Sequence, residues 1–239
     1  MKRRTILSWS SGKDSAWSLQ VLRSDPRYEV VALLTTITRQ FDRVAMHGVR
    51  RELLEAQAAA AALPLWKLEI PTSCSNEDYD AVMRAAVVRA VAEQIECIAF
   101  GDLFLEDIRR YREDRLAGSG LEPVFPLWQK PTDALAREMI DGGLRARISC
   151  VDPRALTADF AGREFDAVLL RDLPAAVDPC GERGEFHTFA YAGPMFEHAI
   201  AIETGETVER DGFVFTDLLA ATAPQVRTAR AADSSSPAS

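Results

Sequence analysis

Near its start the chain reads Thr5-Ile6-Leu7-Ser8-Trp9-Ser10-Ser11-Gly12-Lys13-Asp14-Ser15, an apolar run that ends in a polar turn. The run has the composition of a buried strand, and the apolar spacing of residues 16–22 is typical of a helix. A turn between a strand and a helix N-terminus leaves backbone N–H groups and the positive end of the helix dipole facing one point. Such a point binds anions, most often phosphate.

The residues of this turn fit a polyphosphate that carries magnesium. Gly12 lets the backbone approach closely and Lys13 adds a positive charge. Hydroxyl donors come from Ser10, Ser11 and Ser15. Because Asp14 would repel bare phosphate, we expect a magnesium ion near it, held through phosphate or water. The alternative is a serine-rich turn that begins an ordinary helix, with Lys13 and Asp14 in solvent.

The composition is that of a globular protein with a substantial core. The chain has 239 residues, of which 47% are hydrophobic and 8% aromatic. The net charge of −8 argues against nucleic acid as the main partner. The four cysteines form no CxxC pair, and no apolar run is long enough to cross a membrane. We therefore expect a cytoplasmic protein with reduced thiols.

Four more strands are predicted after the first helix, each separated by a helical pattern. Their ranges are 28–37, 65–70, 97–100 and 123–128. This alternation predicts a Rossmann-like α/β domain, with a parallel five-stranded sheet and helices on both faces. Ligands of such sheets bind at the carboxyl ends of the strands, where Thr35, Gly101 and Asp102 lie. His47, in a connector after the second strand, is also expected near the nucleotide.

The pattern changes near residue 130, where we place a domain boundary. Residues 1–130 form the predicted nucleotide domain, and 131–222 a smaller α+β domain that carries substrate groups. That domain includes a strand at 146–151 and a hairpin, whose strands at 199–203 and 208–215 flank Thr204-Gly205-Glu206. Residues 223–239 have almost no large apolar side chains and are predicted to be disordered.

A second polar stretch, residues 178–189, is too rich in function-capable groups to look like an idle loop. Substrate contacts are expected from Gly181, Glu182, Gly184, Glu185, His187 and Thr188. The two glutamates could hold a cation, bind ammonia or orient an amine, and His187 could shuttle a proton. The alternative is a glycine-rich turn that enters an edge strand. Cys180 could be a nucleophile or structural. A solvated, ion-paired face is expected from Arg109, Arg110, Arg112 and Arg115, and the alternative is that they meet a phosphate or an acidic partner.

The loop resembles the SGGxDS pyrophosphate loop of the ATP pyrophosphatase superfamily, with Ser11 in place of the first glycine. It does not fit GxxxxGK[ST], because Leu7 and Asp14 stand where that motif has Gly and Ser or Thr. Further motifs, at 46–49, 100–102, 125–128 and 180–186, occur in the order found in the diphthine–ammonia ligase-like family. The resemblance covers roughly residues 4–217.

This resemblance implies an ATP-dependent, AMP-forming ligase that adenylates a carboxylate and transfers ammonia to it. Catalytic roles then fall to Lys13, Asp14, Glu182 and Glu185. The family typically reads GEGGE[FY]ET where this chain has His187 in place of the third glutamate, which leaves the acceptor open. The acceptor is a protein-borne or small carboxylate, and self-association into a homo-oligomer is allowed. Alternatives are the same ATP chemistry on a corrinoid-type cofactor carboxylate or a tRNA base, or an ATP/AMP sensor without turnover.

Overall fold

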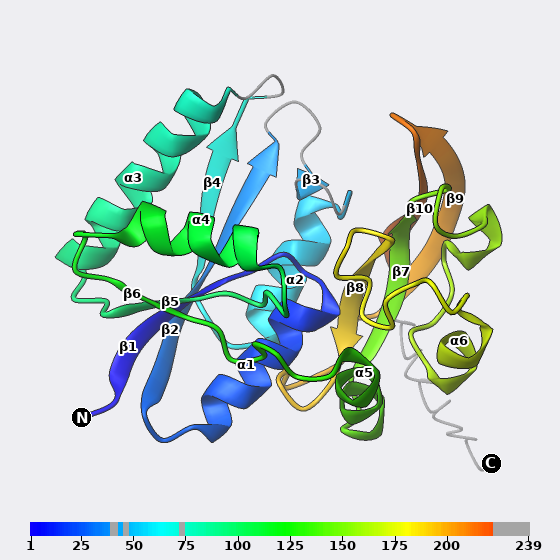
Figure 1. Cartoon of the computed structure of the whole chain (residues 1–239), viewed down its shortest axis with the longest axis horizontal. Coiled ribbons are helices and arrows are strands. Elements are labelled where there is room, and N and C mark those ends of the chain that lie inside the picture. The colour runs from blue at the N-terminus through cyan, green and yellow to red at the C-terminus, as the bar shows by residue number, and fades with distance from the viewer. Residues whose placement is uncertain (39–42, 45–47, 72–74, 222–239) are drawn as a thin grey trace, which may run out of the picture.

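The computed structural model describes residues 1–38, 43–44, 48–71 and 75–221 (Figure 1). His47 and the predicted tail at 223–239 lie outside the described residues. Two sheets stand side by side in Figure 1, the first parallel and N-terminal, the second antiparallel and C-terminal.

The first sheet contains the predicted five parallel strands, in the order β4-β2-β1-β5-β6. They are β1 (Arg3–Ser8), β2 (Tyr28–Thr38), β4 (Leu65–Ile70), β5 (Cys97–Ala99) and β6 (Glu122–Val124). A short antiparallel strand, β3 (Arg43–Val44), pairs with the end of β2. If the five parallel strands are numbered by their order along the chain, their spatial order in the sheet is 3-2-1-4-5. The strand order therefore reverses between β1 and β5.

The fifth strand is shorter than predicted. β6 ends at Val124, and the Trp128 N–H donates to the Phe125 carbonyl at 3.3 Å in a turn. Pro126 stands inside this turn and has no N–H to give to a strand ladder. The predicted strand at 123–128 is therefore wrong beyond residue 124.

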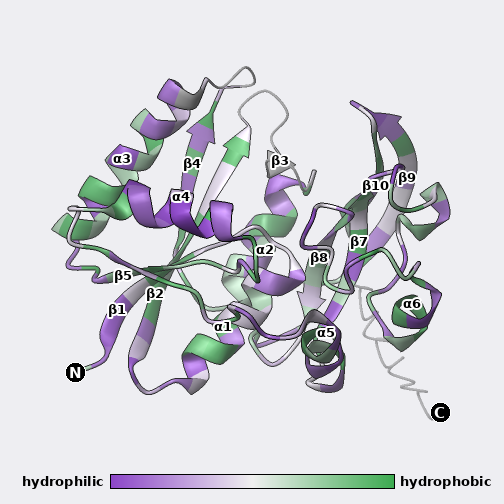
Figure 2. Ribbon diagram, viewed as in Figure 1, coloured by the Kyte–Doolittle hydropathy of each residue, from purple (hydrophilic) through white to green (hydrophobic). Residues whose placement is uncertain are grey.

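Helices cover both faces of this sheet, as predicted. The helices are α1 (Lys13–Ser24), α2 (Arg51–Ala60), α3 (Asn76–Ala92) and α4 (Glu106–Leu116). Neighbouring residues of β1 point to opposite faces: Leu7 joins a buried cluster with α1 and α2, and Ile6 joins another with α3 and α4. Figure 2 shows α4 as largely hydrophilic, which agrees with its position at the solvent side.

The second sheet has the order β8-β7-β10-β9 and is antiparallel throughout. Its strands are β7 (Arg145–Val151), β8 (Phe186–Ala192), β9 (Ile202–Arg210) and β10 (Phe213–Ala220). Beside it lie α5 (Thr132–Asp141), α6 (Ala167–Asp172) and the short 3-10 helix η1 (Ala158–Phe160). The C-terminal region is therefore α+β, as expected.

The turn of the C-terminal hairpin lies later in the sequence than the predicted turn at 204–206. Its turn is Asp211-Gly212, whose φ angles of 53° and 79° suit a two-residue hairpin turn, and Gly205 lies inside β9. An Asp-Gly pair takes these left-handed angles more readily than Thr204-Gly205-Glu206 does. The predicted strands at 199–203 and 208–215 are thus shifted in the structure.

The two sheets share one buried cluster. It joins Leu19 of α1 and Leu53 of α2 to Met139 of α5 and Phe189 of β8, and all four are fully buried. This packing brings β8, at the edge of the second sheet, against the start of α1.

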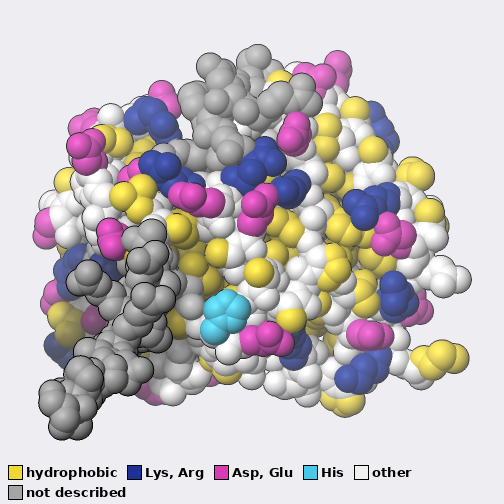
Figure 3. Space-filling model, turned by 180° about the vertical axis from the view of Figure 1, so that it is seen from behind, with side chains coloured by type: hydrophobic (Ala, Val, Ile, Leu, Met, Phe, Trp, Pro, Cys, Tyr) yellow, Lys and Arg dark blue, Asp and Glu magenta, His cyan; other side chains and the backbone are white. Residues whose placement is uncertain are grey.

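The surface carries both signs of charge. On the face shown in Figure 3, Lys and Arg side chains alternate with Asp and Glu, and hydrophobic side chains lie between them. Within the described residues, none of the helices has both the length and the apolar character to cross a membrane.

Candidate active site

A cavity of about 580 Å³ opens at the carboxyl ends of β1, β2, β4 and β5 and is closed on one side by β8. Its volume is in the range of small-molecule sites, and it lies where the strand order reverses. Both polar stretches of the sequence reach it. The predicted residues among its lining are Ser10, Lys13, Asp14, Ser15, Thr35, Gly101, Asp102, Gly181, Glu182, Gly184, His187 and Thr188.

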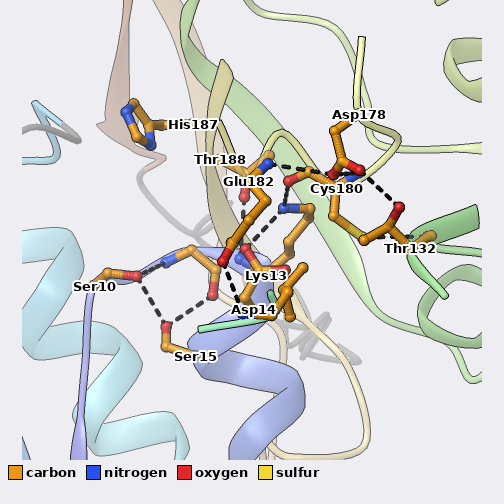
Figure 4. Close-up of polar contacts among 12 residues, drawn as sticks. Ser10, Lys13, Asp14, Ser15, Thr132, Asp178, Cys180, Glu182, His187 and Thr188 are labelled. Carbon is orange, nitrogen blue, oxygen red and sulfur yellow. Dashed lines mark hydrogen bonds and ion pairs between the residues drawn. The ribbon is translucent and has the colours of Figure 1, made fainter. Parts of the chain in front are cut away.

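The start of α1 faces this cavity with two hydroxyl groups. Ser10 Oγ lies 3.3 Å from Ser15 Oγ, and Ser15 Oγ donates to the Gly12 carbonyl at 2.9 Å (Figure 4). The backbone of Gly101 packs tightly against this turn, since a Cβ there would lie 3.2 Å from the Asp14 carbonyl carbon and the Ser15 nitrogen. The N-terminus of α1 and the hydroxyl groups of Ser10 and Ser15 thus lie at one wall of the cavity.

Ser11 and Gly12 lie behind this wall rather than in it. Ser11 is buried and left-handed, with a φ of 70°, a conformation that glycine adopts more easily. Its carbonyl accepts from the Ala190 N–H and from Gln57 Nε2, both at 2.9 Å. The family motif has glycine at this position, and the φ angle explains that preference.

Gln57 is a buried residue that the sequence did not single out. Besides Ser11, its Nε2 donates to the Ala190 carbonyl at 2.6 Å, and its Oε1 accepts from Trp9 Nε1 at 2.9 Å. One amide side chain therefore ties the end of β1, the loop and β8 together.

The ammonium group of Lys13 points toward the C-terminal turn, away from Ser10 and Ser15 (Figure 4). It donates to the Cys180 carbonyl and to Asp14 Oδ2, the latter at 2.8 Å. The residue is only 2% exposed. Burial by itself lowers the pKa of Lys13, but Asp14, Cys180 and Glu182 together outweigh this and raise the pKa, so the side chain stays charged.

Two buried polar atoms in the cavity wall have no hydrogen-bond partner among the described residues. They are Asp14 Oδ1 and Thr35 Oγ1. A carboxylate oxygen without a donor fits magnesium, which prefers oxygen ligands. Since no cluster of three metal-binding side chains is found among the described residues, such an ion would also need phosphate oxygens.

Asp102 forms a bidentate ion pair with Arg112, at 2.6 Å and 3.1 Å. Arg112 lines the cavity, and its guanidinium lies over the Phe100 ring at 4.4 Å. Arg109 and Arg115 fit the expected ion-paired face, since they pair with Glu113 and Asp80. Arg112, expected on the same face, instead lines the cavity, as the alternative of a phosphate contact would require.

Glu182 reaches into the cavity from the C-terminal turn. Its Oε1 accepts the Leu103 N–H at 2.8 Å. Burial raises the pKa of Glu182 to about 7, and the charges of Asp14 and Asp102 add to this, while the Leu103 N–H and Lys13 oppose it. Near neutral pH this carboxyl group therefore exists in both protonation states, as suits a proton acceptor.

Glu185, expected to be catalytic and to bind substrate, does not line the cavity. Its oxygens accept the backbone N–H groups of Asp178 at 3.0 Å and Arg183 at 2.9 Å. Asp178 in turn accepts the Cys180 N–H at 2.9 Å and the Thr132 hydroxyl at 2.7 Å. These two carboxylates hold the turn in shape.

Glycine at 181 is required by the same turn. Its φ is 68°, and a Cβ there would lie 2.8 Å from the Phe186 carbonyl oxygen.

His187 and Cys180 are both electrically neutral at neutral pH. Burial, followed by the charge of Lys13, lowers the pKa of His187 to about 4. Burial raises the pKa of the Cys180 thiol far above its usual range, and the thiol donates to the Thr132 carbonyl at 3.4 Å. Cys180 is thus a packing residue rather than a nucleophile.

Comparison with known proteins agrees with the resemblance seen in the sequence. Residues 3–122 match the family described as the diphthamide synthase N-terminal domain, and residues 131–218 match the diphthamide synthase C-terminal domain. The human protein named diphthine–ammonia ligase is 27% identical over 221 residues, which are 83% of this chain and 82% of the human one. The zebrafish (Danio rerio) protein of that name is 29% identical over 83% of this chain and 86% of its own. The Schizosaccharomyces pombe protein is 26% identical over 84% of this chain but only 36% of its own length. The chain therefore belongs to the diphthamide synthase family.

Proposed function

We propose that this protein is an ATP-dependent, AMP-forming amide ligase that joins ammonia to a carboxylate. One observation carries the proposal: a single cavity is lined by the N-terminus of α1, suited to phosphate, and by Glu182, suited to accept a proton. The relatives named diphthine–ammonia ligase support the same reaction type. They do not favour a tRNA base as acceptor or a sensor without turnover.

ATP would place its phosphates at the start of α1. Ser10, Ser15 and the N-terminus of α1 supply donors, and Arg112 supplies positive charge. Asp14 Oδ1 would hold magnesium, which when bound shields the charge of the phosphates. The nucleoside would occupy the less polar end of the cavity, lined by Leu68, Ile70 and Met83.

The reaction has two steps. In the first, a carboxylate oxygen of the acceptor attacks the α-phosphorus, the bond to the bridging oxygen breaks, and pyrophosphate leaves. In the second, ammonia attacks the acyl carbon of the adenylate, AMP leaves, and an amide is formed. Hydrogen-bond donors that the protein holds in place around the phosphates stabilise the negative charge that develops in the first step.

Glu182 would serve the second step. Ammonia is mostly ammonium at neutral pH, and ammonium has no lone pair with which to attack. A carboxylate with a pKa of about 7, beside Asp14 and Asp102, attracts this cation and can take its proton. Glu185 and Asp178 would act indirectly, because they hold the turn that presents Glu182.

Diphthine, the substrate in the relatives' names, is the first acceptor to test. His187 stands where the family has a glutamate, and its imidazole is neutral at neutral pH, so the acceptor need not be diphthine itself. We propose that residues 1–130 bind the nucleotide and that 131–222 contact the acceptor. A location in the cytoplasm and a homo-oligomeric state remain predictions.

The test is a product assay with Mg·ATP, ¹⁵N-ammonium and a panel of carboxylates that includes a diphthine-containing substrate. We expect AMP, pyrophosphate and a ¹⁵N-labelled amide. ADP and orthophosphate, or no turnover together with no ATP binding, would contradict the proposal.

A matched pair of variants tests the nucleotide site. Arg112→Met should weaken Mg·ATP binding at least tenfold, since a charge-assisted contact is worth roughly 1.5–3 kcal/mol. Arg115→Met, on the same helix but paired with Asp80, should leave ATP affinity within twofold. Calorimetric titration of both variants measures the difference, and equal affinities would argue against phosphates beside Arg112.

A further inference from the structure

We propose that Lys13 is a positioning residue that fixes the turn carrying Glu182, rather than a ligand of the ATP phosphates. The inference rests on the proposed function, because the step it serves is the use of ammonium. It assigns the lysine of the loop to the second step of the reaction, whereas its place in the motif suggested the first.

The contacts of Lys13 all lead into the C-terminal region or to Asp14. Its backbone N–H donates to Thr188 Oγ1 at 3.0 Å, and its ammonium donates to the Cys180 carbonyl. The same ammonium lies over the rings of Phe165 and Phe186, at 5.6 Å and 5.3 Å from their centres. The ammonium of Lys13 thus has two hydrogen-bond acceptors, a carboxylate among them, and two aromatic rings around it without any ligand.

Release of the ammonium toward phosphate would leave buried groups without partners. The Cys180 carbonyl would lose its donor, and Asp14 Oδ2 would lose the hydrogen bond that it accepts from Lys13. Phosphate has other donors nearby, in Ser10, Ser15 and Arg112. The fold therefore favours a lysine that stays in place when nucleotide binds.

Lys13 sets the position of Glu182 through a short path. Cys180, which Lys13 holds, lies two residues before Glu182 in a turn that Asp178 also fixes. The far end of Glu182 is held by the Leu103 N–H at 2.8 Å. The distance from the loop to the proton acceptor thus depends on the Lys13–Cys180 bond.

The test is a double-mutant cycle with Lys13→Met and Glu182→Gln, measured as Mg·ATP affinity and as ammonium-dependent AMP release with the acceptor found above. In Lys13→Met we expect the ATP Kd to stay within threefold, and the apparent KM for ammonium to rise at least tenfold. In the Glu182→Gln background, Lys13→Met should add less than a twofold effect, because the residue through which it acts is gone. A tenfold or greater loss of ATP affinity, or effects that multiply, would overturn the assignment.

A measurement on the wild type keeps the proposal testable if Lys13→Met does not fold. Hydrogen exchange of residues 178–188 is followed with and without Mg·ATP. If Mg·ATP leaves the exchange rate of these amides unchanged or slows it, Lys13 keeps its hydrogen bond to the Cys180 carbonyl. Faster exchange with Mg·ATP would show that this hydrogen bond has broken. If the wild type binds ATP but releases no AMP with any acceptor, the proposed function fails, and this measurement still decides the place of Lys13.

Discussion

Replacing Glu182 with glutamine should make the protein more stable at alkaline pH and less active. The pKa of Glu182 is about 7 in the fold, against 4.5 for a free glutamate, because burial disfavours its charged form. That difference corresponds to about 3 kcal/mol of stability lost once the group is ionised. Since the side chain is partly exposed, solvent screening lowers the figure to about 1.5–2 kcal/mol.

The sign of the pH dependence follows from the raised pKa. The folded state holds the proton of Glu182 more tightly than the unfolded state, so the contribution of this group to stability is fully present below pH 4.5. This contribution falls as the pH rises from 4.5 to about 7, and the loss is complete above that. Glutamine has no charge to bury and keeps an oxygen for the Leu103 N–H, so Glu182→Gln should not lose this stability.

Urea unfolding of both proteins at pH 5 and pH 8 measures the effect. We expect a gap below about 0.5 kcal/mol at pH 5, and about 1.5–2 kcal/mol in favour of the variant at pH 8. Glu209→Gln, at an exposed position of β9, is the control and should change neither value. A gap of the same size at both pH values would refute the argument from burial.

The same variant should lose activity. Removal of a positioned base typically lowers the rate 10²- to 10⁴-fold, so ammonium-dependent AMP release should fall by about that factor at pH 7. Higher pH should restore part of the rate, because more of the ammonia is then already free of its proton. An unchanged rate at pH 7 would exclude Glu182 as the proton acceptor.

Three further substitutions test the frame around the cavity. Ser11→Gly should raise stability by about 1 kcal/mol, because a left-handed serine is strained, and should leave ATP affinity within threefold; a lower melting temperature would contradict this. Gln57→Leu should lower the free energy of unfolding by roughly 2–4 kcal/mol, since it leaves the buried Trp9 indole N–H and the Ala190 carbonyl without a hydrogen-bond partner. A loss below about 1 kcal/mol in urea unfolding would show that these two groups find other partners. Gly181→Ala should lower the free energy of unfolding by more than about 2 kcal/mol, whereas Gly184→Ala, with no atom within 4 Å of the added Cβ, should lower it by less. Equal losses of stability in the two variants would mean that the Phe186 carbonyl moves aside.

Periodicity was enough to predict the parallel sheet, its helices and the edge at which the cavity opens. These features depend on patterns of 6 to 18 neighbouring residues, which are visible in the sequence. The prediction of the C-terminal hairpin was wrong because two turn signals lie close together in the sequence. Gly205 gave a turn signal inside β9, while the Asp211-Gly212 pair that forms the turn was overlooked.

The direction of each polar side chain could not be predicted in the same way. Glu182 and Glu185 are three residues apart and chemically alike, yet one enters the cavity and the other binds the backbone of its own turn. Lys13 meets Cys180, which is 167 residues away in the chain. Such contacts depend on how the two sheets pack, and no short window of sequence contains that information.

The hydrogen bond from Ala190 to Ser11 also sets an order of events during synthesis. The strand that holds the left-handed residue of the loop is translated about 180 residues after the loop itself. A contact of such long range forms late, because closing the intervening chain must come first. At ribosomal rates of about 5–20 residues per second, the loop waits for roughly ten seconds or more without its partner. We therefore expect the nascent chain to bind nucleotide at this loop only after β8 has been made.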